Sequence, residues 1–209
     1  MAGWSSKHTI LFILGLAIIA VSANPLFITL EPASMPLKVT LDSTVIFGGS
    51  LVGYALFLYL FSTTTPANRL VDFWLRSAGF MRGVLYVWVI PAILITLWYT
   101  PHFLSFSLSS SFGLTLEVLS MSFAGLLAGY AWGAMSKTMR TATLFMVFFM
   151  SGTMGELLTE EGGVNVFFPA NYPFYAQSQI LYTGYLMWVI SLIPVTYYAA
   201  KVLKDMGLY

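Results

Sequence analysis

Six long apolar stretches constrain this chain more than any other feature of its sequence. Each is close to the roughly 20 residues that an α-helix needs to cross a bilayer core of about 30 Å. They cover residues 9–30, 43–63, 83–100, 113–134, 140–158 and 179–200. Because lipid offers the backbone no hydrogen-bond partners, each stretch is predicted to be a helix. The sequence therefore predicts one all-α integral membrane domain over residues 1–209, with six transmembrane helices.

The composition agrees with this class and excludes several functions. The chain is 58% hydrophobic and only 8% charged, whereas soluble domains carry about 25% charged residues. A net charge of +1 without any Lys/Arg-rich run argues against nucleic acid as a partner. The absence of cysteine excludes disulfides, zinc–thiolate sites and iron–sulfur ligation. Neither a nucleophile–base arrangement nor an HExxH, P-loop or GxSxG motif occurs, so we expect no enzymatic activity.

The basic residues predict the orientation of the helices. With six spans, the two termini and the loops between helices 2–3 and 4–5 lie on one side, and that side holds every Lys and Arg except Lys38. By the positive-inside rule, both termini are cytoplasmic in a multi-pass protein of the plasma membrane. Most acidic residues fall on or near the outer side: Glu31, Asp42, Glu117, Glu156, Glu160 and Glu161.

A short internal repeat links the second and fourth predicted helices. "FGGSLVGYA" (47–55) and "FAGLLAGYA" (123–131) share Phe, Gly, Leu, Gly, Tyr and Ala, and each follows an acidic residue, Asp42 or Glu117. Both helices would run inwards, so we predict parallel, duplicated hairpins formed by helices 2–3 and 4–5. Glycines four residues apart allow close helix packing, and we expect it at Gly49, Gly53, Gly125 and Gly129. A flat cofactor such as haem on this glycine face is the alternative.

Histidine and methionine are the candidate metal ligands. A bis-histidine haem site is excluded, because His8 and His102 are predicted on opposite sides of the membrane; a His/Met pair stays open. Met146, Met150 and Met154 form a stripe that suits either Cu(I) or adaptable packing. We expect no cofactor on this chain, although lipids would bind; copper held by the Met stripe and His102 is the alternative.

Two further groups of residues are candidates for function. Glu117, Glu156 and His102 would form a proton or cation site, since ionisable residues are costly in a membrane; interfacial polar residues are the alternative reading. Aromatic residues are predicted to meet a partner or the lipid interface. They are Phe167, Phe168, Tyr172, Phe174 and Tyr175 of the loop at 159–179, with Trp188 of the last helix.

The stretches "LWYTPHFLSFSL" (97–108) and "QSQILYTGYLMW" (177–188) resemble the CtaG family of haem-copper cytochrome oxidase assembly factors and a related archaeal membrane family of unknown function. "LWYTPHFLSFSL" (97–108) looks like that family's Trp-His-x-Pro segment. "QSQILYTGYLMW" (177–188) is similar to its Gln-Gln–Gly–Leu-x-Met-Trp pattern, through Gln179, Gly184, Leu186, Met187 and Trp188. The resemblance covers roughly residues 40–205.

The departures from that family's pattern decide which role we expect. Tyr99 stands where the family has His after Trp, His102 follows three positions later, and Asp42-Ser43 replaces an acid followed by His. The resemblance therefore implies a non-catalytic accessory subunit of a respiratory complex, most simply a haem-copper terminal oxidase, with other membrane subunits as partners. An oxidase assembly or copper-handling factor is one alternative, and a small proton or cation transporter is the other.

Overall fold

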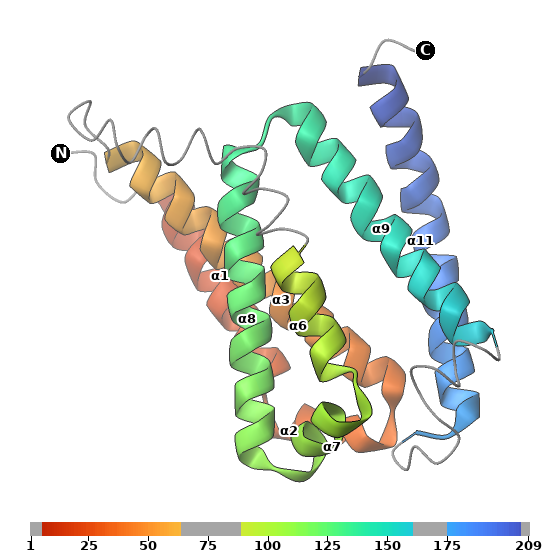
Figure 1. The fold of residues 1–209 in the computed structure, drawn as a ribbon. Helices are drawn as coiled ribbons and strands as arrows, with labels where there is room; N and C mark the ends of the chain where they lie inside the picture. The colour runs from red at the N-terminus through yellow and green to blue at the C-terminus, as the bar shows by residue number, and fades with distance from the viewer. Residues whose placement is uncertain (1–5, 64–88, 161–174, 206–209) are drawn as a thin grey trace. The chain divides into compact units, whose positions relative to one another are not determined.

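The structure is a computed structural model that describes residues 6–63, 89–160 and 175–205. Every regular element in these ranges is helical. The chain divides into two compact units (Figure 1). Unit 1 comprises Met1–Glu31 and Leu37–Met135, and unit 2 comprises Pro32–Pro36 and Ser136–Tyr209. We describe each unit by itself.

The described elements of unit 1 begin with α1 and end with α8. In chain order they are α1 (Ser6–Ser22), α2 (Pro25–Ile28), the start of the 3-10 helix η1 (Glu31–Ala33), most of α3 (Met35–Thr63), α6 (Ile90–Trp98), α7 (Pro101–Ser109) and α8 (Ser111–Ala134). Both α6 and α7 pack against α8. The hydroxyls of Ser22 and Thr44, 2.7 Å apart, join the end of α1 to α3.

Residues 9–30, predicted as one helix, form two helices that meet at a bend. α1 ends at Ser22, and α2 begins at Pro25 after a bend of 40°. Proline disfavours a helical conformation in the residue before it, and Asn24 is accordingly extended. Its side chain accepts a hydrogen bond of 2.9 Å from the amide of Leu26, so it caps the new helix.

The second predicted helix begins well before residue 43. α3 starts at Met35 and runs for 29 residues, which is about 44 Å at a rise of about 1.5 Å per residue. Pro36 does not prevent this start, because amides in the first helical turn have no intrahelical acceptor. Lys38 and Asp42, predicted outside the helix on the outer side, consequently lie within α3.

The third predicted helix, 83–100, is described only from residue 89. α6 ends at Trp98, and Thr100 is extended before Pro101, where the chain starts a separate helix, α7. Residues 83–88 lie outside the described ranges. The fourth predicted helix, 113–134, corresponds to α8, which starts at Ser111 behind the N-cap Ser110.

Glycines bring the backbones of α3 and α8 into direct contact. A Cβ added to Gly53 would overlap the carbonyl oxygen of Leu126, and one on Gly129 would overlap that of Ser50. Gly49 and Gly125 meet at the same crossing, where a Cβ on Gly125 would lie 3.1 Å from the Cα of Gly49. Residue numbers rise together along both helices, so they are parallel. The two copies of the repeat therefore pack on each other.

Unit 2 contains the helical pair α9 (Lys137–Thr159) and α11 (Gln177–Asp205), which pack side by side (Figure 1). These are the predicted helices 140–158 and 179–200. Gly155 and Gly184 let the two backbones approach, since a Cβ on either would lie within 2.7 Å of the other's carbonyl oxygen. At the start of α11, the side-chain amide Nε2 of Gln179 donates to the carbonyl of Ala33 at 2.9 Å.

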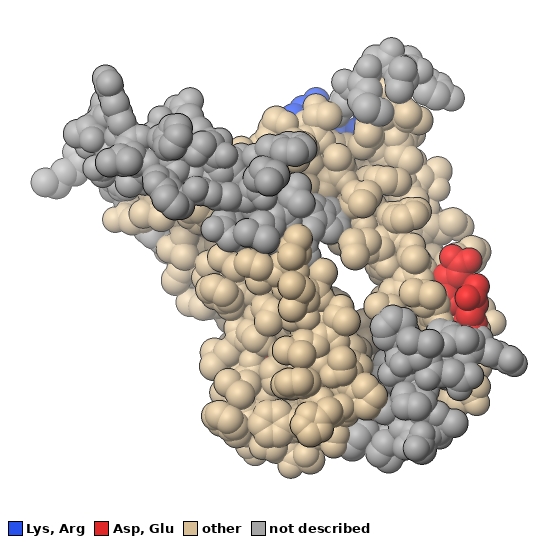
Figure 2. All heavy atoms as spheres, in the orientation of Figure 1, with Lys and Arg blue, Asp and Glu red and all other residues tan. Residues whose placement is uncertain are grey.

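Four described helices are long and apolar enough to cross a membrane. They lie within Met35–Leu60, Ser111–Ala134, Lys137–Thr159 and Gln177–Lys204, and the bent pair Ser6–Ser22 with Pro25–Ala33 raises the number to five if it forms one span. Figure 2 shows that almost all described atoms on the face drawn are uncharged. The protein is thus an all-helical membrane protein in its described part.

Candidate functional site

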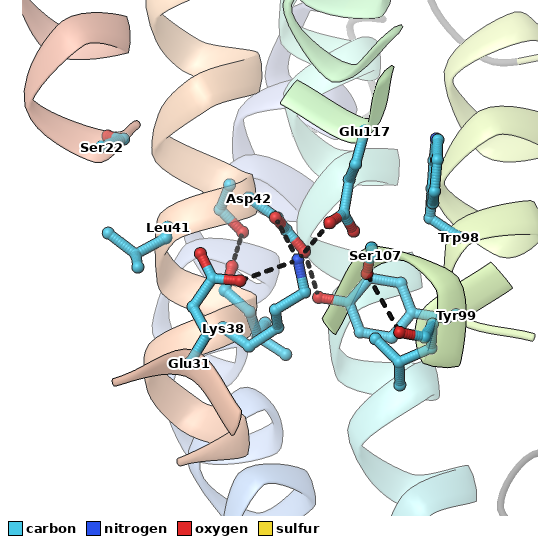
Figure 3. Close-up of polar contacts among 12 residues, drawn as sticks. Ser22, Glu31, Lys38, Leu41, Asp42, Trp98, Tyr99, Ser107 and Glu117 are labelled. Carbon is cyan, nitrogen blue, oxygen red and sulfur yellow. Dashed lines mark hydrogen bonds and ion pairs between the residues drawn. The ribbon is translucent and has the colours of Figure 1, made fainter. Parts of the chain in front are cut away.

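A buried lysine surrounded by three carboxylates lies near the start of α3 and α8 (Figure 3). The Nζ atom of Lys38 lies 3.2 Å from Glu31 Oε2, 3.1 Å from Asp42 Oδ1 and 2.7 Å from Glu117 Oε2. Glu31 comes from η1, Asp42 from the next turn of α3, and Glu117 from α8. We call these four residues the Lys38 cluster.

The Lys38 cluster is almost completely removed from solvent. The side chains of Lys38 and Glu117 are each 1% exposed, that of Glu31 is 4% exposed, and that of Asp42 is 10% exposed. Lys38 also lies in the first turn of α3, where the positive end of the helix dipole disfavours a cation. The three carboxylates offset the desolvation of the Lys38 ammonium and its unfavourable interaction with the helix dipole. Removal of any one carboxylate therefore changes the electrostatic energy of the whole cluster.

Two aromatic residues at the end of α6 are linked to the Lys38 cluster by hydrogen bonds, Tyr99 directly and Trp98 through Ser120. The hydroxyl of Tyr99 donates to Asp42 Oδ2 at 2.8 Å, on the carboxylate oxygen that does not face Lys38. The indole Nε1 of Trp98 donates to Ser120 Oγ at 2.7 Å, and Ser120 donates in turn to the carbonyl of Glu117 at 2.9 Å. The break between α6 and α7 thereby orients both Asp42 and the turn of α8 that carries Glu117.

The charges of the Lys38 cluster do not cancel. Three carboxylates and one ammonium give a net charge of −2 if all are ionised. Glu117 Oε1 is buried and has no hydrogen-bond partner among the described residues. A buried charge without full pairing is costly, so this oxygen is a position where a proton or another cation would be strongly favoured.

An apolar layer closes the Lys38 cluster on one side. Val45 lies almost one turn after Asp42 on α3, and Met121 one turn after Glu117 on α8; with Trp98 they form a buried core. Beyond them lies the glycine crossing of α3 and α8. The cluster itself is within about 10 Å of the first residues of both helices, at about 1.5 Å per residue. The cluster therefore lies toward the N-terminal ends of α3 and α8.

The predicted proton or cation residues have different environments. Glu117 belongs to the Lys38 cluster of unit 1, and Glu156 is an exposed residue of α9 in unit 2. His102 is exposed at the start of α7, with its ring edge-on to Phe103 at 5.8 Å between centroids. The structure thus assigns a buried ionic environment to Glu117 only.

The remaining candidate residues have varied environments. Met146 and Met150 are 42% and 46% exposed on α9, and Met154 is half-buried. Trp188 is 45% exposed on α11, whereas Tyr175, predicted at an interface, is buried at 5% exposed. Four of the predicted interface aromatics lie outside the described residues: Phe167, Phe168, Tyr172 and Phe174. Copper binding and the docking role of the loop stay predictions.

Four residues of the site were not predicted as site residues: Glu31, Lys38, Asp42 and Tyr99. Lys38 was treated as the one basic residue on the outer side, and hydropathy alone gave no reason to place it in a helix. The signal that was present is the spacing of Lys38 and Asp42, four residues apart in "LKVTLD", which is typical of an ion pair on a helix face. Their meeting with Glu117 depends on the parallel packing of α3 on α8.

The comparisons with known proteins place the chain in a family but attach no activity to it. The model of a family described as "Protein of unknown function (DUF1404)" matches residues 13–205. The chain belongs to this family. No curated protein matches, and no solved structure matches. For this DUF1404 protein, the argument for a function rests on the Lys38 cluster.

Proposed function

We propose that this DUF1404 protein moves protons or small cations across the membrane and that the Lys38 cluster is its ion-binding station. The observation that carries the proposal is the meeting of Glu31, Asp42 and Glu117 on the single buried ammonium of Lys38. Apolar residues could pack these helices at lower cost, because the desolvation of buried ions is expensive. Ionisable groups within membrane helices are for this reason typical of ion pathways and proton relays.

The proposal includes the finer topology predicted from the sequence. It assumes six spans with both termini cytoplasmic in the plasma membrane, so that the N-terminal ends of α3 and α8 meet the outer side. The cluster would exchange ions with that side first, since Asp42 is its most exposed member. A second conformation would have to separate the apolar layer of Val45, Trp98 and Met121 to release the ion inwards.

The other functions expected from the sequence have less support in the geometry. A purely structural subunit needs no net negative charge in its interior, so the Lys38 cluster would have no role in it. The link to a haem-copper oxidase stays a prediction. Copper handling would use the stripe of Met146, Met150 and Met154 on α9 with His102 on α7. Met146, Met150 and His102 are exposed rather than enclosed in a site. The Lys38 cluster favours the transport hypothesis over both.

Flux measurements in liposomes test the proposal. The purified protein would be reconstituted in vesicles with a pH-sensitive dye inside, and a pH gradient or a Na⁺ or K⁺ gradient would be imposed. We expect a flux that falls at least tenfold in Glu117→Gln and is unchanged in Glu156→Gln, the same substitution at an exposed position. No flux above that of empty vesicles, or an equal flux in both variants, would refute the proposal.

A further inference from the structure

The position of Lys38 limits which ion the cluster can take. Its Nζ atom lies within 3.2 Å of an oxygen from each of the three carboxylates, and so occupies the point where a metal ion would bind them. Ca²⁺ and Mg²⁺ need carboxylate oxygens at about 2.0–2.6 Å with no competing cation between them. Among the described residues, no group of three His, Asp or Glu is arranged to hold a metal ion.

The hydrogen bonds around the cluster distinguish its three carboxylates. Asp42 has both oxygens engaged, one by Lys38 and one by the Tyr99 hydroxyl. Glu31, at the first residue of η1, pairs with Lys38 of α3. Glu117 is different, because Oε2 faces Lys38 while Oε1 is buried with no hydrogen-bond partner among the described residues.

We infer that the ion handled by the Lys38 cluster is the proton and that Glu117 carries it. This inference rests on the proposed function and names its substrate. The charged groups that face Glu117 are Lys38 and Asp42 of α3 and Glu31 of η1, with Tyr99 behind Asp42. With the proton on Glu117, the cluster holds one ammonium and two carboxylates, for a net charge of −1.

The exchange step needs no partner other than water. When the O–H bond of the Glu117 carboxyl breaks, the proton passes to water and the electron pair stays on the carboxylate. The new carboxylate is held by the ammonium of Lys38, 2.7 Å away. Reprotonation reverses the step. Lys38 keeps its proton throughout, so it acts as a positioning residue that holds the carboxylates and excludes metal ions.

Infrared spectroscopy of the full-length protein in lipid tests this assignment. A protonated carboxyl group gives a C=O stretch that is separate from the carboxylate bands. At neutral pH we expect one such band per chain, lost in Glu117→Gln, displaced in Glu117→Asp and unchanged in Glu156→Gln. Calorimetric titration with Na⁺ and with Ca²⁺ is expected to detect no stoichiometric binding to the wild-type protein.

The outcomes separate the inference from the function it rests on. A carboxyl band that persists in Glu117→Gln, or binding of one Na⁺ or Ca²⁺ per chain, would overturn the inference even if liposomes show flux. If Glu117→Gln does not fold, Glu117→Asp decides, because an unshifted band would also overturn it. The expected bands without any proton flux would support the proton site and refute transport.

Discussion

Replacement of Lys38 by methionine is the perturbation with the largest expected effect on stability. Methionine has a similar length but no charge, so the two buried carboxylates of Glu31 and Asp42 would lose their common cation. They lie 3.2 Å and 3.1 Å from Nζ. At an effective dielectric constant of about 20, each attraction is about 5 kcal/mol. The desolvation of the ammonium and the repulsion among the carboxylates oppose this sum, since buried ions each lose several kcal/mol of hydration.

The net cost follows from measured losses of one partner from a buried ion pair. We expect Lys38→Met to lower the free energy of unfolding by about 3–5 kcal/mol, a large share of a total stability of about 5–15 kcal/mol. Addition of Asp42→Asn removes one orphaned carboxylate, so the double variant should be more stable than the sum of single effects predicts, by about 0.5–3 kcal/mol.

Unfolding by SDS in mixed micelles, followed by circular dichroism, measures these differences. Lys204→Met is the matched control, because Lys204 is exposed in the last turn of α11. The reasoning would be refuted if Lys38→Met were as stable as this control. It would also be refuted if Asp42→Asn failed to improve the Lys38→Met background.

Two further predictions concern the contacts around the cluster. Tyr99→Phe removes the hydroxyl that binds Asp42 at 2.8 Å and should cost about 1.5–3 kcal/mol, the range for a hydrogen bond to a charged group. The same unfolding assay should give no change for Tyr182→Phe, at a position that is 58% exposed; equal effects would contradict the role of Tyr99. Gly129→Ala forces a methyl group into the backbone of α3 at Ser50 and should cost about 1–3 kcal/mol. Gly152→Ala meets Ser191 Cβ at an ordinary 3.4 Å and should change stability by less than about 1 kcal/mol; a larger loss for Gly152→Ala would contradict the close α3–α8 crossing.

The sequence was sufficient to predict the membrane class and the approximate extent of several helices. Apolar length determines these properties, and α8 and α9 differ from the predicted ranges by only a few residues at each end. The small-residue spacing also pointed to Gly49, Gly53, Gly125 and Gly129, which lie at the α3–α8 crossing. Apolar length and glycine spacing are properties of a single helix, so they can be recognised from the sequence alone.

The Lys38 cluster could not be predicted in the same way. Hydropathy treats Lys38 and Asp42 as loop residues, because it scores each side chain as if it faced lipid or water. Their burial depends on a long α3 that begins at Met35 and on Glu117 from a helix far along the chain. Ion pairs between residues far apart in the sequence form only when the helices pack, so the sequence pattern of one helix does not predict them. The sequence offered two hints: the spacing of Lys38 and Asp42 by four residues, and an acidic residue a few positions before each repeat copy, Asp42 and Glu117.

Solid-state NMR of the protein in lipid bilayers tests the central claim most directly. The chain has only five lysines, so ¹⁵N labelling of their side chains gives a simple spectrum. The account predicts that one Nζ signal correlates through space with the carboxyl carbons of one Asp and two Glu residues, and that this signal persists in Lys204→Met. Lysine signals that show no carboxyl correlation would contradict the account, because Lys38 would then be solvated and the cluster absent.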